Sequence, residues 1–245
     1  MQLKERTILI TGGTSGIGRA LVEQLAHKNH AVIVIASNRE KLSSLSTAYD
    51  NVFSYPCCLA DRQEVESTIA TILERHPDVS VAINSAGIQV QPLLRDPQFS
   101  FDSIGKEITV NLTAPIWICS LLINHFLALG FSSAYINLTS ALALYPKRSS
   151  AVYCATKAGL LNFSRSLSYQ LESTSVHVHA AILPLVDTPM SEGRGRSKIS
   201  AAQAATEIVS GVEKNRDVIY VGKARFMPIL SRLSPGLMAN LMKRG

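Results

Sequence analysis

The stretch that decides the fold is TILITGGTSGIG (residues 7–18), in which a short apolar run ends in a glycine-rich turn. Residues 7–10 have the length and composition of a buried strand, and a helical pattern begins near Arg19. Glycines at such a junction permit a tight turn and close approach of the backbone to a pyrophosphate, while the following helix offers unpaired N–H groups. The position predicts a phosphate-binding loop, although a glycine-rich sequence can also be nothing more than a turn.

Strand-length apolar runs recur along the chain and alternate with stretches of helical period. The runs are 7–10, 31–35, 52–55, 79–83, 134–138, 176–183 and 218–221, and the helical stretches include 19–28, 62–75, 107–129, 152–172 and 201–214. This alternation is typical of right-handed strand–helix–strand units. We predict an α/β fold with a doubly wound, seven-stranded parallel sheet and helices on both faces (Rossmann-type), in a single domain over residues 1–245.

Composition favours a packed core and argues against a nucleic-acid partner. The 245 residues are 47% hydrophobic and 17% charged, which suits strands that helices bury on both faces. Lys and Arg outnumber Asp and Glu by 24 to 18, a net charge of +6, but no alternation of aromatic and basic residues accompanies the excess. We expect a solvated basic rim, part of which faces an anionic cofactor.

Neither a membrane span nor a metal site is expected. The best candidate span, residues 117–131, is interrupted by Asn124 and His125. The first apolar run is too short for the core of a signal peptide. The four cysteines show neither a disulfide pattern nor metal-ligand spacing, so the cytoplasm is the expected compartment.

The end of the second predicted strand bears on the choice between NAD(H) and NADP(H). An acidic residue there would bind the ribose 2′-hydroxyl and repel a 2′-phosphate, but the residues are Ser37, Asn38 and Arg39. The guanidinium of Arg39 can pair with a phosphate, and Asn38 can donate a hydrogen bond. NADP(H) is therefore favoured over NAD(H), although Arg39 can also be an exposed helix residue and Arg19 can serve the phosphate instead.

Tyr153 and Lys157 are four residues apart in a stretch of helical period, so their side chains share one face. A phenol with a pKa near 10 is a poor base at pH 7, and a neighbouring ammonium favours the phenolate. Such pairs are common on helix surfaces, so the pair alone carries little weight.

Other motifs give the pair its significance. The glycine-rich turn comes first, then Asn84-Ser85-Ala86-Gly87 after the fourth strand, Asn111 in a long helix, and Ser140 after the fifth strand, thirteen positions before Tyr153. In order and spacing the set resembles the short-chain dehydrogenase/reductase family, in its single-domain branch of about 250 residues. The resemblance runs from residue 7 to residue 188.

The resemblance implies a role for each matching residue. In the family the Tyr donates or accepts the proton, the Lys holds the ribose and lowers the Tyr pKa, the Ser orients the carbonyl and the Asn anchors a water, which maps onto Tyr153, Lys157, Ser140 and Asn111. The residues implied in cofactor binding are Gly12, Thr14, Ser15, Gly16, Ile17, Gly18, Asn38, Arg39, Leu59, Asn84, Ala86, Gly87, Tyr153, Lys157, Val186 and Thr188. The implied function is an NAD(P)-dependent oxidoreductase, an enzyme that transfers hydride between the cofactor and a carbonyl or alcohol.

Four departures from the family pattern affect mainly the binding of the cofactor. Ser85 replaces the usual second Asn, and the usual Arg after the second strand is Asn38, with Arg39 one place later. Cys58 stands where an Asp commonly meets the adenine, which leaves that contact to the backbone near Leu59. The usual Pro-Gly pair is Leu183-Pro184, followed by Val186 and Thr188 at positions that meet the nicotinamide carboxamide.

The residues expected around the substrate are mostly apolar. They are residues 141–145, Leu185 and the loop 189–198, which is typical of a mobile surface loop. An apolar small-molecule carbonyl or alcohol is the expected substrate, although these side chains can equally pack against the sheet.

Residues 226–241 place apolar side chains at helical spacing among basic ones. Such a segment can touch a membrane surface, but subunit packing or closure of the substrate cleft is favoured. The helices at 107–129 and 152–172 pair across a two-fold axis in the family that the chain resembles, so a homo-oligomer, a dimer or tetramer, is expected.

Two other classes of function stay open beside the oxidoreductase. One is a cofactor-binding sensor or scaffold without turnover, and the other is a non-redox isomerase or dehydratase on the same fold. The intact set of Tyr153, Lys157, Ser140 and Asn111 argues against a sensor, which has no need of all four.

Overall fold

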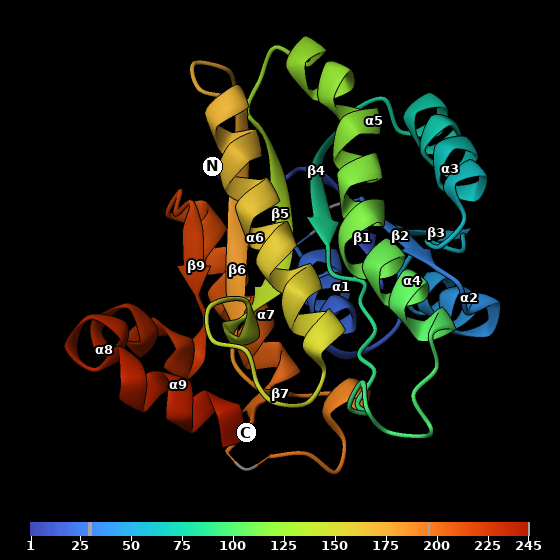
Figure 1. Ribbon diagram of the computed structural model, residues 1–245. Helices are drawn as coiled ribbons and strands as arrows, with labels where there is room; N and C mark the ends of the chain where they lie inside the picture. Colours follow the sequence, from blue (N-terminus) through green and yellow to red (C-terminus); the bar gives the residue numbers. More distant parts are fainter. Residues whose placement is uncertain (29–30, 196, 245) are drawn as a thin grey trace.

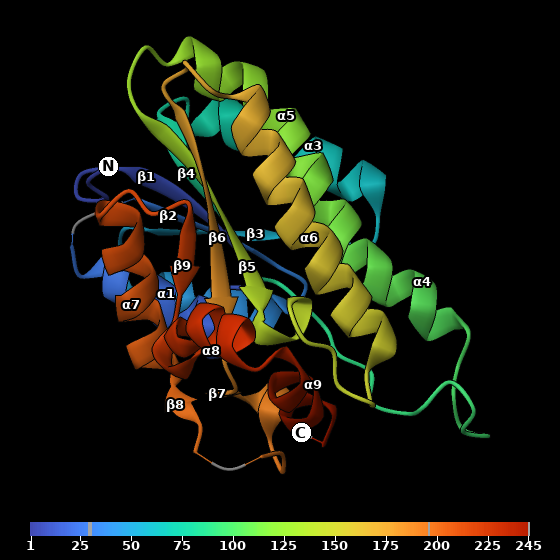
Figure 2. The ribbon, with the colours of Figure 1, turned by 60° about the vertical axis from the view of Figure 1, so that its left-hand side comes forward.

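The computed structural model describes residues 1–28, 31–195 and 197–244, and in them a parallel sheet carries helices on both faces (Figures 1 and 2). The strands of this sheet have the spatial order β3-β2-β1-β4-β5-β6-β9. Their bounds are β1 Thr7–Thr11, β2 Val32–Ala36, β3 Val52–Pro56, β4 Val79–Asn84, β5 Ser133–Ser140, β6 Val176–Leu183 and β9 Val218–Tyr220. The prediction of seven parallel strands is confirmed.

The helices form two layers with a separate C-terminal pair. Their bounds are α1 Gly16–Ala26, α2 Arg39–Ala48, α3 Arg62–Arg75, α4 Asp102–Ile108, α5 Ala114–Ala128, α6 Ala151–Gln170, α7 Ala201–Glu213, α8 Met227–Leu233 and α9 Pro235–Arg244. One core cluster joins α1, α2 and α7 to the first face of the sheet, and a second joins α3, α5 and α6 to the other. Helices α8 and α9 contribute Met227 and Met238 to a third cluster against β6.

The alternation of side chains along β1 explains why both faces need cover. Successive residues of a strand point to opposite faces. Ile8 and Ile10 belong to the first cluster and Leu9 to the second, and none of the three is exposed. A strand buried in this way carries a continuous apolar run, which is the pattern that identified it in the sequence.

Two short strands lie outside the prediction. Val186–Asp187 (β7) pairs in parallel with Ile199–Ser200 (β8) beside the main sheet. Two residues cannot show a period, so no sequence pattern predicts either strand. They bound the expected mobile loop 189–198, in which a 3₁₀ turn spans Pro189–Ser191 and Arg196 lies outside the described residues.

A continuous helical run of 27 residues, Asp102–Ala128, covers the sheet beside α6 (Figure 2). By length and composition alone it could cross a membrane. Its inner face, with Ile118, Leu122 and Phe126, is instead packed in the second core cluster. The run is therefore a core helix of this fold, and its apolar character follows from that packing.

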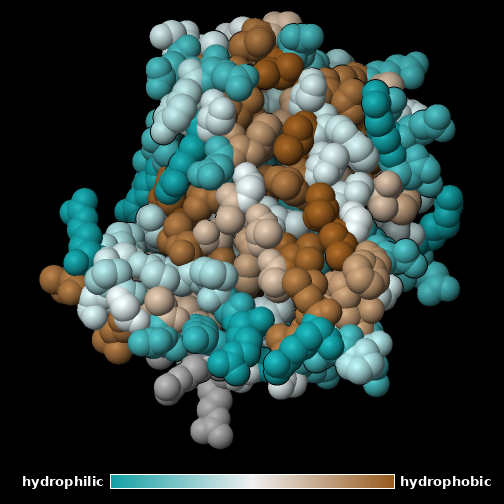
Figure 3. Space-filling model, viewed as in Figure 1, coloured by the Kyte–Doolittle hydropathy of each residue, from teal (hydrophilic) through white to brown (hydrophobic). Residues whose placement is uncertain are grey.

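Hydrophobic side chains gather on the outer face over α5 and α6 (Figure 3). Ile108 and Leu127 remain 39% and 44% exposed. This is the face on which the sequence places the expected pairing of subunits. At the C-terminal segment, the side chain of Leu241 lies outside the described part of the chain.

The approach of Gly12 to the turn after β4 gives a test of the fold. Gly12 has φ +69°, and a Cβ there would lie 2.7 Å from the Cα of Ala86. Gly130 has φ +70° and open space around it, so Gly130→Ala should lower the free energy of unfolding by only the left-handed backbone cost, about 1–2 kcal/mol. Gly12→Ala should lose clearly more, measured by urea denaturation of both variants. Equal losses would contradict the close approach.

Candidate functional site

The carboxyl ends of the central strands meet at one edge of the sheet, where a cavity of about 550 Å³ lies. Pairing aligns the strand ends, because Thr11 of β1 lies opposite Asn84 of β4, which in turn lies opposite Asn137 of β5. The chain reverses its direction of winding between β1 and β4, and ligands of such sheets bind in this crevice. The cavity extends from Ser37 and Leu59 at one end to Tyr153 and Lys157 at the other.

The glycine-rich turn forms one wall of this cavity. Thr14, Ser15, Gly16, Ile17 and Gly18 line it together with Gly12, as the sequence predicts. A Cβ at Gly18 would collide with the carbonyl oxygen of Gly12, so the tight turn requires glycine there. Helix α1 starts at Gly16, three residues before the predicted start, and its N-cap Ser15 makes no side-chain capping bond. The first N–H groups of α1 therefore lack a side-chain cap and suit a bound phosphate.

The turn after β4 forms the floor and is fixed by one hydroxyl. Thr11 Oγ1 accepts hydrogen bonds from the backbone N–H groups of Ser85 and Ala86, each at 3.1 Å. Ala86 and Gly87 line the cavity, as expected for cofactor-binding residues. A Cβ at Gly87 would lie 3.3 Å from Asn111 Oδ1. The floor is therefore shaped by small residues next to polar groups.

Asn84 does not line the cavity, which corrects its prediction as a cofactor-binding residue. Its side chain is 2% exposed and points into the sheet, where Nδ2 donates to Asn137 Oδ1 at 2.8 Å. Asn137 donates in turn to Ser164 of α6 at 2.9 Å. Asn84 braces β4 against β5 and α6, which is the part of its implied role that the geometry supports.

Asn111 lies in a π-helical turn, Thr109–Thr113, between α4 and α5. Its side chain is fully buried, accepting from Ile88 N–H at 2.8 Å and donating to the Ile88 carbonyl at 2.8 Å and to Thr156 Oγ1 at 3.3 Å. These bonds engage the side-chain amide, and the implied role of Asn111 in anchoring a water stays a prediction. Asn111 ties the segment after β4 to α6. π-turns of this kind are frequent at functional sites.

Tyr153 and Lys157 lie one turn apart at the start of α6, and Ser140 ends β5 next to them. The Ser140 hydroxyl forms a hydrogen bond with Tyr153. Lys157 Nζ donates to the Leu138 carbonyl at 2.9 Å and lies 5.7 Å from the centre of the Tyr153 ring. Phenol, hydroxyl and ammonium therefore converge at the end of the cavity opposite Ser37 and Leu59.

Burial dominates the protonation of both titratable groups. Burial raises the pKa of Tyr153 to about 12, with a further rise from Cys154, against the lowering effects of the Ser140 hydrogen bond and the Arg194 charge. Burial lowers the pKa of Lys157 to about 8. Burial outweighs the expected lowering of the Tyr153 pKa by Lys157. Tyr153 is a phenol at neutral pH, ready to donate a proton.

Three other predicted cofactor residues lie off the cavity surface. The Asn38 side-chain oxygen accepts from the Lys41 N–H and caps α2, whose first residue, Arg39, is exposed beyond Ser37. Val186 is 5% exposed and its side chain packs in the first core cluster, so the contact of this position with the carboxamide stays a prediction. Thr188, two residues later, does line the cavity.

The structure also adds residues that the sequence did not single out. Lys106 and Val110 line the cavity from one face of the helical run, and Met190 lines it from the loop after β7. The i, i+4 spacing of Lys106 and Val110 indicates in the sequence that the two side chains share one face of a helix. Arg194 Nη1 donates to Gln89 Oε1 at 2.6 Å and links the two segments on the substrate side.

Comparison with known proteins gives the family. Residues 6–198 match the model of the short chain dehydrogenase family. The chain belongs to this family. As a short-chain dehydrogenase it is an NAD(P)-dependent oxidoreductase that transfers hydride between a nicotinamide cofactor and a carbonyl or alcohol.

This short-chain dehydrogenase has relatives of similar length and fold. It is 31% identical over 226 residues to the uncharacterized oxidoreductase DltE of Bacillus subtilis, covering 89% of each chain. A short chain dehydrogenase from Burkholderia cenocepacia in complex with NADP has a TM-score of 0.87 at 22% identity over 99% of both chains. One from Burkholderia phymatum in complex with NAD has a TM-score of 0.84 at 17% identity, covering 95% of this chain and 96% of that one. These structures share the fold.

The pKa of Lys157 predicts a pH dependence for cofactor capture. The pH dependence of kcat/KM for the reduced cofactor reports the pKa values of titratable groups in the free protein. The Lys157 pKa is about 8, so its ammonium, which the family role assigns to the ribose, is lost as pH rises through 8, while Tyr153 stays protonated. We expect kcat/KM to be level below about pH 7 and to fall above pH 8.

Unfolding does not explain such a fall. The folded pKa of Lys157 lies below the ordinary lysine value of 10.5, so its contribution to stability increases as pH rises between about 8 and 10.5. Initial rates from pH 6 to 10, with circular dichroism as the control for folding, make the measurement. A level profile up to pH 10 would contradict the assigned state of Lys157.

Proposed function

We propose that this short-chain dehydrogenase is an NADP(H)-dependent reductase of carbonyl compounds, with Tyr153 as the proton donor. The observation that carries the proposal is a phenol held protonated by burial at the end of the cavity and hydrogen-bonded to Ser140. Negative charge grows on a carbonyl oxygen as hydride reaches its carbon, and two hydroxyl donors at that oxygen stabilise the transition state. A bound nicotinamide cofactor supplies the hydride.

The chain's own residues divide the remaining work. The uncapped start of α1 and the small residues of the glycine-rich turn fit a pyrophosphate. Lys157 extends toward the ribose end of the cavity, and Asn111 fixes the segment at Ile88 that closes it. Ile88, Leu183 and Met190 give the cavity apolar walls, which support an apolar body for the substrate.

The preference for NADP(H) rests on the residues after β2. Ser37 lines the cavity, and no acidic residue stands at Ser37, Asn38 or Arg39. Because the Asn38 oxygen is engaged in capping α2, its amide nitrogen is the group left to donate to a phosphate. Arg39 follows at the positive end of α2, where an anion is favoured.

Proton transfer is tested by Tyr153→Phe. Removing the general acid should lower kcat for ketone reduction by about 100-fold or more and leave NADPH binding, followed by fluorescence, nearly unchanged. Tyr169→Phe is the matched control, because Tyr169 lies on the same helix and is 67% exposed. Equal turnover by the Tyr153→Phe variant and the wild type would refute the proposal.

Cofactor preference is tested by Arg39→Ala. Loss of a charge-assisted hydrogen bond to the 2′-phosphate should lower the ratio of kcat/KM for NADPH over NADH by about tenfold. Lys41→Ala removes a cation from the same exposed turn of α2 and should leave the ratio unchanged. A ratio that Arg39→Ala does not alter would remove Arg39 as the determinant, and Arg19→Ala would then test the other candidate.

A further inference from the structure

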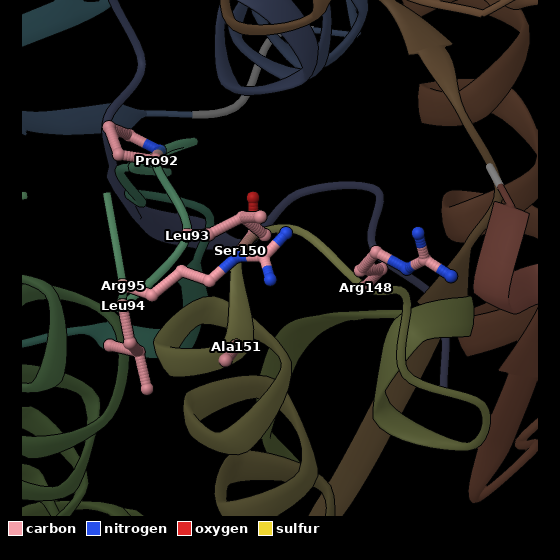
Figure 4. Close-up of a pocket in the computed structure, with 7 residues that line it drawn as sticks. All are labelled: Pro92, Leu93, Leu94, Arg95, Arg148, Ser150 and Ala151. Atoms are coloured by element: carbon pink, nitrogen blue, oxygen red, sulfur yellow. The ribbon is translucent and has the colours of Figure 1, made fainter.

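A second cavity, of about 580 Å³, lies beside the first turn of α6 (Figure 4). One wall is the segment Pro92 to Arg95, and the other is formed by Arg148, Ser150 and Ala151. No role described so far uses these residues. Tyr153 lies three residues after Ser150, about 4.5 Å farther along the helix axis, so the cavity adjoins the reaction site.

The start of α6 offers hydrogen-bond donors to this cavity. Ser150 is the N-cap of the 20-residue helix and adopts a left-handed conformation, φ 59° and ψ 46°, in which its side chain makes no capping bond. The first N–H groups of a helix have no partner within it, and the N-terminus carries a partial positive charge. An anion in the cavity would find both the donors and the favourable field.

Ser150 itself gives an independent sign of a missing ligand. The residue lines the cavity and is 3% exposed, and its buried hydroxyl has no hydrogen-bond partner. Buried hydroxyls in folded proteins nearly always have one. A ligand oxygen in this cavity would supply it.

The charged side chains that line the cavity are both basic. Figure 4 shows the Arg95 guanidinium beside Ser150 and Arg148 on the opposite side of it. Among the described residues, neither arginine lies within ion-pair distance of a carboxylate. The nearby Asp96 carboxylate is engaged with the Leu93 N–H at 2.6 Å. Two arginines without an ion pair among the described residues thus line a cavity at a helix N-terminus.

We propose that this second cavity binds an anionic group of the substrate, a carboxylate or a phosphate ester, while the carbonyl of the same molecule lies at Tyr153. The proposal rests on the proposed reductase function for the substrate role. It names the substrate class as carbonyl compounds with an apolar body and one anionic end. Arg95 and Arg148 provide the charge, and Ser150 with the first turn of α6 provides the hydrogen bonds.

Matched ketones test the substrate class. 4-Acetylbenzoate should be reduced with a kcat/KM about tenfold above that of its methyl ester, and the difference should shrink at high salt. 4-Acetylphenyl phosphate distinguishes a site that prefers phosphate from one that prefers carboxylate. Arg95→Gln and Arg148→Gln should remove the preference and leave the ester unaffected. Arg165→Gln, on the exposed side of α6, is the control and should keep the preference for the acid over the ester.

Binding of inorganic phosphate tests the cavity without turnover. With saturating cofactor present, so that the glycine-rich turn is occupied, phosphate should raise the melting temperature of the wild type but not of Ser150→Gly. Glycine adopts the positive φ of this position freely, so that variant loses the hydroxyl without a folding penalty. A phosphate shift without any ketone reduction would refute the reductase and keep the anion site. No phosphate shift, or equal rates with acid and ester, would overturn the present proposal.

Discussion

The site depends on two hydrogen bonds that the Thr11 hydroxyl accepts from the backbone N–H groups of Ser85 and Ala86. They join the ends of β1 and β4 at the point where the order of winding reverses, and they hold Ala86 so close to position 12 that only glycine fits there. The cofactor cavity is the space left on the open side of this junction. The glycine-rich turn and the turn after β4 thus become one surface, although Thr11 and Ser85 are 74 residues apart in the chain.

Beyond this junction, hydrogen bonds link the segment after β4 to α6, the helix that carries Tyr153. The Asn111 side chain forms hydrogen bonds with the N–H and carbonyl groups of Ile88 and with the Thr156 hydroxyl. The Thr156 hydroxyl in turn donates to the Tyr153 carbonyl at 2.8 Å. The floor of the cavity and the first turn of α6 are therefore positioned relative to each other by buried, saturated bonds. Such networks are worth most where solvent is excluded, as it is here.

Local patterns predicted the sheet, the helices of the layers and the pair Tyr153 and Lys157, because period and spacing are properties of neighbours in the chain. They failed where the outcome depends on distant contacts. Asn84 turns into the sheet because Asn137 of another strand lies opposite it, and Val186 is buried by a pairing of two-residue strands. The π-turn around Asn111 interrupts no hydrophobic pattern, and the pKa of Tyr153 is raised by burial that no motif encodes.

The buried row Asn84, Asn137 and Ser164 also bears on how the chain avoids misfolding. Every residue of β4 and β5 is buried, so burial alone does not fix the alignment of the two strands. A shift of one residue moves a side chain to the opposite face of a sheet. Either amide would then be stranded in hydrocarbon without its partner. The hydrogen bonds among Asn84, Asn137 and Ser164 therefore favour the alignment of β4 and β5 that builds the cavity.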